Sequence, residues 1–214
     1  MSLSDQLSSV YENFSTNAPP QVFDAITTAK NGFEASFNID TAIKVGDTIP
    51  EFRLVNAVGD EVKSSDLLPQ GPLLLSFYRG EWCPFCNLAL VAMQKHLNDF
   101  KSKGVILVAI SPELPNQSLT TVEKHNLKFP VLSDVGNVFS KQLGILFTQP
   151  DTLRPVFKYF GHDLEARNGD DTFAVPIPAT LLVDTKGVVR NAYIEPDYTK
   201  RLETSTALEW IDAL

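Results

Sequence analysis

Two sets of hydrophobic positions at the start of the chain have a helical spacing. Residues 4–14 and 21–30 carry apolar side chains every three or four residues, and Pro19–Pro20 separates the two sets. This spacing places apolar side chains on one face of a helix. We therefore predict two amphipathic helices in an N-terminal extension, residues 1–43, ahead of a main domain, residues 44–214. The apolar faces must pack on that domain or on a second subunit, so the pattern is compatible with a homodimer.

Beyond residue 44, short apolar runs alternate with helical patterns. Residues 52–62 alternate around Gly59 and predict a β-hairpin. Continuous apolar runs are typical of strands buried on both faces, and short runs of this kind occupy residues 73–78, 105–110 and 130–132. Helical spacing follows these runs in residues 88–104, 118–125 and 137–143. Alternating strands and helices predict a parallel arrangement at the centre of a sheet.

The C-terminal third has a different pattern. Residues 180–184 and 188–193 flank the turn Thr185–Gly187 and predict an antiparallel hairpin, and residues 205–213 predict a closing helix. The fold class is therefore α/β, with a mixed central sheet flanked by helices. Residues 145–177 do not fit this alternation, and we expect them to form an insertion with a short helix at 152–160 and a polar loop at 167–171. Long connections of this kind often act as lids or contact surfaces.

Two cysteines carry the candidate chemistry. Cys83 and Cys86 follow directly after a predicted buried strand, and Pro84 suits the first turn of the next helix. Free N–H groups and the helix dipole stabilise a thiolate at a helix N-terminus. A separation of three places both sulfurs on one turn, within reach of a reversible disulfide. The alternatives are two inert buried thiols, or a zinc site, for which the three histidines lack the usual spacing.

The residues around this pair have both functional and ordinary interpretations. Trp82 either shields the sulfurs or simply packs. Arg79 either holds a thiolate or is a solvated loop charge, and the sequence favours the loop charge slightly. Glu81 is interpreted as a surface residue. Pro178 precedes a predicted strand, which favours an ordinary strand start, although a cis-proline turn is the alternative.

Composition and charge narrow the class of protein. A chain of 214 residues with 43% hydrophobic residues can bury a core without metals, and a net charge of −8 without a basic patch argues against nucleic-acid binding. The N-terminal residues do not have the pattern of a secretory signal, and no apolar run is long enough to span a bilayer. We therefore expect a cytoplasmic protein, where a close cysteine pair favours catalysis over a permanent disulfide.

Several motifs occur together in an order that resembles a known family. The chain resembles the peroxiredoxin-like branch of the alkyl hydroperoxide reductase/thiol-specific antioxidant (AhpC/TSA) family, within the thioredoxin-like fold. The resemblance covers the chain from about residue 44 and implies no bound cofactor. It rests on the segments Gly46–Leu54, Gly71–Pro72, Ser76–Cys86, Ala109–Pro112, Val131–Asp134 and Pro178–Asp184.

The resemblance assigns roles to the site residues. Alignment on Phe77–Tyr78 puts Cys86 at the family's peroxidatic position, Cys83 in place of a threonine and Arg79 in place of a proline. The family's later arginine falls on Pro178. The loss of threonine and arginine implies weaker polarisation of the peroxide O–O bond unless Arg79 substitutes.

The replaced residues resemble a different class of site. The Cys-Pro-Phe-Cys motif resembles those of glutaredoxins, and the tryptophan before it resembles thioredoxins. The position of Pro178 resembles the cis-proline of thioredoxin-like oxidoreductases, which raises the expectation of a cis bond there.

Three hypotheses follow. In the first, which we favour, the protein is a thiol-dependent peroxidase: Cys86 attacks a hydroperoxide, Cys83 resolves it as a disulfide, and an external dithiol such as thioredoxin or a glutaredoxin-like protein reduces the pair. In the second, the protein is a thioredoxin- or glutaredoxin-like disulfide oxidoreductase in which Cys83 attacks a protein disulfide. In the third, two subunits pool their cysteines around a metal or iron–sulfur cluster.

Overall fold

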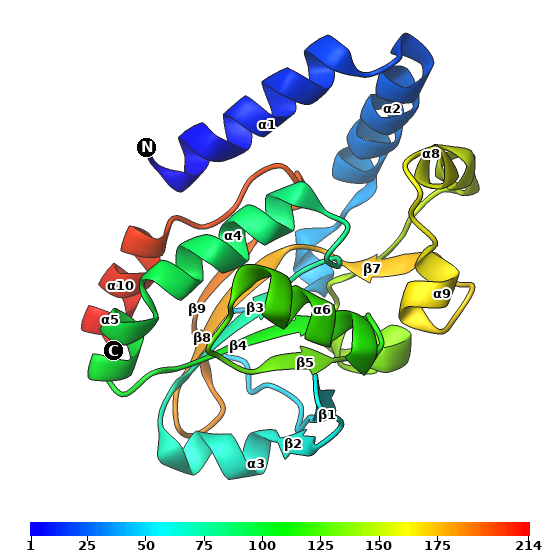
Figure 1. Ribbon diagram of the computed structural model, residues 1–214. Helices are drawn as coiled ribbons and strands as arrows, with labels where there is room; N and C mark the ends of the chain where they lie inside the picture. The colour runs from blue at the N-terminus through cyan, green and yellow to red at the C-terminus, as the bar shows by residue number, and fades with distance from the viewer.

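A mixed seven-stranded sheet forms the centre of the computed structural model, which describes residues 1–214 (Figure 1). The strand order is β2-β1-β5-β4-β3-β8-β9, with β3, β4 and β5 mutually parallel and the other pairs antiparallel. This confirms the predicted α/β class and both predicted hairpins. The strands are Arg53–Asn56 (β1), Glu61–Lys63 (β2), Leu73–Phe77 (β3), Ile106–Ser111 (β4), Val131–Ser133 (β5), Ala179–Val183 (β8) and Val189–Ile194 (β9).

Helices cover both faces of this sheet and extend beyond one end of it (Figure 1). None of them combines the length and the apolar character that crossing a membrane requires. The predicted helix over 88–104 is in fact two helices, because the backbone leaves the helical region at His96 (φ −101°, ψ 10°). The helices are Leu3–Asn17 (α1), Pro20–Ser36 (α2), Ser64–Leu67 (α3), Pro84–Lys95 (α4), Leu97–Ser102 (α5), Pro115–His125 (α6), Val138–Gln142 (α7), Arg154–Tyr159 (α8), Leu164–Asn168 (α9) and Thr204–Asp212 (α10).

Strand β3 is buried on both faces and fixes where the cysteine loop begins. Its residues alternate between the two hydrophobic cores: Leu73, Leu75 and Phe77 pack on one side of the sheet, and Leu74 on the other. Fully burying such side chains stabilises the fold by about 1.5–3 kcal/mol each. The pairing continues one residue past the strand, where the Tyr78 N–H donates to the Ile110 carbonyl at 2.9 Å. The loop that follows therefore leaves a rigid sheet at a defined point.

The first helix of the N-terminal extension packs on the main domain. Leu3 and Leu7 of α1 are buried in the same core as α4. The Glu203 carboxylate accepts the N–H groups of Leu3 and Ser4 at 3.3 and 2.7 Å, and a carboxylate is favourable at this end of a helix. The two predicted helices are therefore present, and they lie at one end of the molecule beside α8 (Figure 1).

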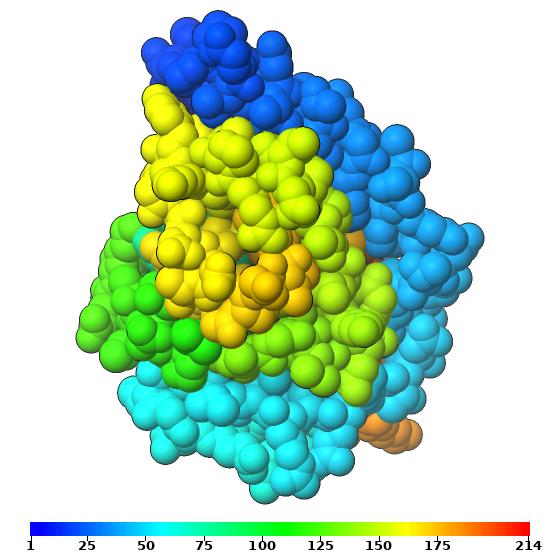
Figure 2. Space-filling view, turned by 90° about the vertical axis from the view of Figure 1, so that its right-hand side faces the viewer, coloured from blue at the N-terminus to red at the C-terminus, as the bar shows by residue number.

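The segment at 145–177 has more structure than its sequence predicts. The expected short helix is present as a 3₁₀ turn followed by α8. The expected polar loop at 167–171 is partly helical, because Asp163 caps α9 by accepting the Ala166 N–H at 3.0 Å. A two-stranded ribbon of β6 (Leu146–Thr148) and β7 (Ala174–Pro176) was not predicted, since three-residue strands leave no readable period. Figure 2 shows this segment against the N-terminal helices.

Candidate active site

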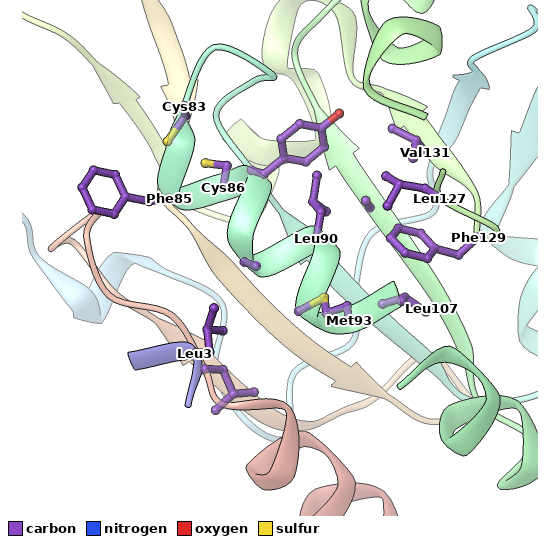
Figure 3. Packing of buried hydrophobic residues seen from close by; sticks show 14 of the residues in the cluster. Leu3, Cys83, Phe85, Cys86, Leu90, Met93, Leu107, Leu127, Phe129 and Val131 are labelled. Carbon is purple, nitrogen blue, oxygen red and sulfur yellow. The ribbon is translucent and has the colours of Figure 1, made fainter. Parts of the chain in front are cut away.

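The cysteines lie where β3 passes into α4. Gly80 has a φ of +143°, which favours glycine, and a Cβ there would meet the Trp82 indole nitrogen at 2.4 Å. Cys83 is the residue immediately before α4, and Pro84 is its first helical residue, as expected for a proline. Cys86 lies one turn further on, and Figure 3 shows the two sulfurs close together on this first turn. The local geometry is therefore that of a reversible dithiol pair.

Both cysteines are free thiols with no solvent exposure. Burial opposes ionisation of Cys83. The hydrogen bond from the Cys86 thiol and the charges of Arg79 and Arg201 outweigh it and hold the pKa of Cys83 well below its ordinary value. Burial and the adjacent Cys83 charge raise the pKa of Cys86 well above its ordinary value. These opposite shifts favour a thiolate on Cys83 over one on Cys86.

Arg79 is a buried component of this site, so its interpretation as a solvated loop charge is wrong. Its guanidinium carbon lies 4.6 Å from the Trp82 ring centroid and 4.1 Å from that of Tyr198. The side chain is held between these two rings and is only 8% exposed. A cation between aromatic faces is stabilised by their quadrupoles. No carboxylate forms an ion pair with Arg79, and Cys83 and Cys86 are the groups whose negative charge would raise its pKa.

Arg201 is a site residue that the sequence did not indicate. Its Nη2 donates to Sγ of Cys86 at 3.0 Å. Its Nη1 donates to the backbone carbonyls of Tyr198 and Lys200, which fixes the guanidinium in place. The two partners are 115 residues apart, and no local motif marks the arginine. The family's later arginine aligns with Pro178, so the sequence predicted that the site lacks this guanidinium. In the structure Arg201 supplies a guanidinium beside Cys86 instead.

Trp82 and Pro178 both line the cavity beside the cysteine loop. Trp82 is buried and packs edge-on against Phe157 of α8, with ring centroids 4.9 Å apart. Pro178 lines the same cavity as Trp82 and Arg79, but its peptide bond is trans, so the expectation of a cis bond is wrong. Here β7 runs almost directly into β8, and the Pro178 carbonyl accepts the Glu195 N–H at 3.2 Å. An extended trans bond maintains this course of the backbone.

A network of ion pairs and one backbone hydrogen bond holds the loop that precedes the cysteines. Glu81 is buried rather than on the surface, and it pairs with Lys124 and with Arg167 of α9. The fully buried Glu113 accepts the Glu81 backbone N–H at 2.9 Å and pairs with Arg167 at 3.1 Å. The interpretation of Glu81 as a surface residue is therefore wrong. Through Arg167, the insertion holds the loop that carries the cysteines.

We expect Arg167→Met to lower the free energy of unfolding by about 3 kcal/mol at neutral pH, because it leaves the buried Glu113 carboxylate without a cation, whereas Glu81 keeps Lys124. Burial raises the pKa of Glu113, and Arg167 opposes that rise. A carboxyl with a raised folded pKa adds stability below its unfolded pKa of about 4.3 and loses that contribution as the pH rises through the folded pKa. The loss caused by Arg167→Met should therefore be larger at neutral than at acidic pH.

Denaturant unfolding at several pH values measures this effect. The control is Arg53→Met, which removes an exposed pair with Glu61 at 3.8 Å and should cost less than about 1 kcal/mol. Adding Glu113→Gln to Arg167→Met should recover part of the stability. Equal losses at acidic and neutral pH would contradict the assignment of the effect to Glu113.

The residues of the site do not include a set suited to a metal ion. No group of three or more histidine, cysteine, aspartate or glutamate side chains converges in the structure. The polar groups near the sulfurs are the two arginines, which repel cations. The site therefore offers thiol chemistry from the chain's own residues.

The sequence of this chain is similar to those of named peroxiredoxins. The chain is 39% identical over 105 residues to a protein of Buchnera aphidicola that is provisionally named peroxiredoxin bcp. The matched region covers 49% of this chain and 66% of that relative. It is 29% identical over 103 residues to the peroxiredoxin Bcp of Escherichia coli, covering 48% and 65%. The matches thus span just under two thirds of these relatives' lengths.

A solved structure and a family profile extend the comparison. The crystal structure of peroxidoxin BcpB from Mycobacterium tuberculosis superposes with a TM-score of 0.64 at 21% identity, covering 80% of this chain and 98% of that one. This likeness shows a shared thioredoxin-like fold. The profile of the AhpC/TSA family matches residues 45–192, from the first hairpin to the last strand and including the cysteine pair. The chain therefore belongs to the AhpC/TSA family.

Proposed function

We propose that this protein is a thiol-dependent peroxidase, which reduces hydroperoxides with Cys83 and Cys86 and is recycled by an external dithiol such as thioredoxin. The observation that carries this proposal is the buried, unbonded cysteine pair beside two guanidinium groups, Arg79 and Arg201, which favour a thiolate there. A thiolate is the nucleophilic form of cysteine. Fixed positive charges stabilise the negative charge that develops on the leaving oxygen as the O–O bond breaks.

The charge distribution supports a definite order of steps. The Cys83 thiolate attacks the outer peroxide oxygen, the O–O bond breaks, and the leaving alkoxide takes the proton of Cys86. The products are a sulfenic acid on Cys83 and an alcohol. The resulting Cys86 thiolate, held by Arg201, attacks the Cys83 sulfur and releases hydroxide, which solvent protonates. Overall, thiol, thiolate, hydroperoxide and one proton give a disulfide, an alcohol and water.

This order differs from the one expected from the family alignment, in which Cys86 attacks first. The physical reason for proposing Cys83 is that its pKa is lowered while that of Cys86 is raised, so the nucleophilic thiolate forms more readily on Cys83. Cys86 is then positioned as the acid for the first step and the nucleophile for the second. The same two sulfurs serve either order.

A peroxide-consumption assay tests the proposed activity. Reduced protein is mixed with one equivalent of hydrogen peroxide, and free thiols and Trp82 fluorescence are followed in a stopped-flow instrument. We expect the loss of two thiols per peroxide, followed by sustained turnover when thioredoxin, its reductase and NADPH are added. Thiol loss at the rate of free cysteine would overturn the proposal.

Disulfide exchange with a protein is a second candidate function, because the cysteine whose pKa is lowered is the N-terminal one, as that mechanism requires. Both sulfurs are fully buried, so a small hydroperoxide reaches them more readily than a protein disulfide, and exchange with any protein, thioredoxin included, requires the cysteine loop to open. Insulin reduction with dithiothreitol discriminates the two candidates. Rapid insulin reduction together with slow peroxide consumption would favour this second function.

A further inference from the structure

A mostly apolar cavity of about 230 Å³ lies beside the cysteine loop. Its walls come from α1, α2, the 145–177 segment and the loop residues Arg79 and Trp82. Helix α2 has no fully buried residue, and Ile26, Ala29 and Phe33 on its apolar face pack at the edge of the cores and line this space. Neither N-terminal helix lies within the part of the chain that matches the family profile, so this wall is an addition to the family's domain.

Three buried side chains on the cavity wall have N–H groups without an acceptor. They are Nε of Arg79, Nε1 of Trp82 and Nε2 of Gln149, in residues that are 8%, 8% and 3% exposed. A buried donor without a partner costs about 1–3 kcal/mol, so such groups mark places where an acceptor binds. The apolar wall and the unpaired donors together suit an amphipathic molecule with an oxygen-bearing head.

The charges identify the head as an anion. Arg79 has no carboxylate partner, and Arg201 donates only to backbone carbonyls and to Cys86. Lys30, the other cation on the wall, is already paired with Glu34 and Asp197. In the reduced protein a thiolate of the cysteine pair, which the two arginines favour, offsets their charge. Disulfide formation removes this negative charge and leaves Arg79 as a buried cation without a counter-ion, an unfavourable state.

We propose that the cavity binds a medium-chain monocarboxylate, with its acyl chain against the wall of α2 and its carboxylate on Arg79, and that the disulfide form binds it more tightly. A cavity of about 230 Å³ has room for a short acyl chain, and octanoate is the probe chosen for it. Linkage is reciprocal, so the ligand stabilises the disulfide in turn. The proposal does not depend on the peroxidase activity, because any oxidant that forms the disulfide creates the same charge state.

The test measures binding of octanoate, 1-octanol and octylamine by calorimetry to protein reduced with dithiothreitol and to protein oxidised with diamide. We expect octanoate to bind the oxidised protein at least tenfold more tightly than the reduced protein. A tenfold preference lowers the reduction potential of the pair by about 30 mV in saturating octanoate. The two uncharged or cationic analogues should show no such preference. Peroxide consumption is measured separately, so failure of either proposal is recognised by itself.

Two variants make the test specific. Ala29→Phe fills the cavity from α2 and should abolish octanoate binding, while Ala35→Phe, at an exposed position on the same helix, should leave it unchanged. Gln149→Leu should weaken binding of octanoate but not of octanol, because it removes a donor and keeps the apolar volume. Absence of octanoate binding to both redox forms, equal binding to both, or octanol binding as tightly as octanoate would each overturn the proposal.

Discussion

Cys83→Ser is expected to reduce the reaction with peroxide to the uncatalysed rate, whereas Cys86→Ser should still consume one equivalent of peroxide and then stop. The difference follows from the charge distribution, since the pKa of Cys83 is lowered and that of Cys86 is raised. Without Cys83 the remaining thiol is the fully buried Cys86, and burial opposes formation of the nucleophilic thiolate. Without Cys86 the attack still takes place, but no second sulfur can displace the sulfenic hydroxyl.

Stopped-flow peroxide consumption and mass spectrometry after dimedone treatment measure this difference. Dimedone should label Cys83 in the Cys86→Ser protein, and label neither wild type, which closes its disulfide, nor Cys83→Ser. Far-ultraviolet circular dichroism of both variants provides the control for folding. The opposite result would be sulfenic acid on Cys86 in the Cys83→Ser protein, formed at the rate at which the wild-type protein loses thiols. It would show that Cys86, at the family's usual position, attacks first and that the proposed order is reversed.

Arg79→Met should have the second-largest effect, a loss of about 10²–10³-fold in the rate of peroxide reaction at neutral pH. Arg79 is the strongest positive charge acting on Cys83, so its removal raises the pKa of that thiol. It also removes a cation from the place where the leaving oxygen becomes negative. Because the pKa rises, the rate of the variant should increase with pH over a range in which the wild-type rate is already constant.

The pH profile distinguishes this role from mere packing between Trp82 and Tyr198. Arg79→Lys keeps the charge but loses the planar stacking, so it should retain a wild-type pH profile with a smaller loss of rate. The matched control is Arg190→Met, which removes a half-exposed arginine paired with Asp184 on β9. A slower Arg79→Met reaction with an unshifted pH profile would mean that Arg79 only packs and does not lower the pKa of Cys83.

Much of the domain was predictable because its elements are local. Strand β3 is a continuous apolar run, and its residues face two cores, which is why the pattern indicated a buried strand. The hairpins β1–β2 and β8–β9 each contain turn residues that can be recognised in a short stretch of sequence. The β6–β7 ribbon was missed because it pairs three-residue strands across almost 30 residues, where no periodicity develops.

The sequence by itself determined the dithiol. The strand before it, the turn through Gly80, and Pro84 at the start of α4 are decided by hydrogen bonds and backbone preferences within a few residues. The spacing of Cys83 and Cys86 then places both sulfurs on one turn. A sequence pattern is sufficient for such features, since every group involved is close along the chain.

Only the tertiary structure decided how the dithiol is charged. Arg201 reaches Cys86 from 115 residues away, Arg79 is buried by Tyr198 from the C-terminal region, and the apolar wall beside them comes from the N-terminal helices. The pKa of a buried thiol depends on the charges that surround it in space and on its distance from water. These quantities arise when the sheet brings distant segments together, and no short window of sequence contains them.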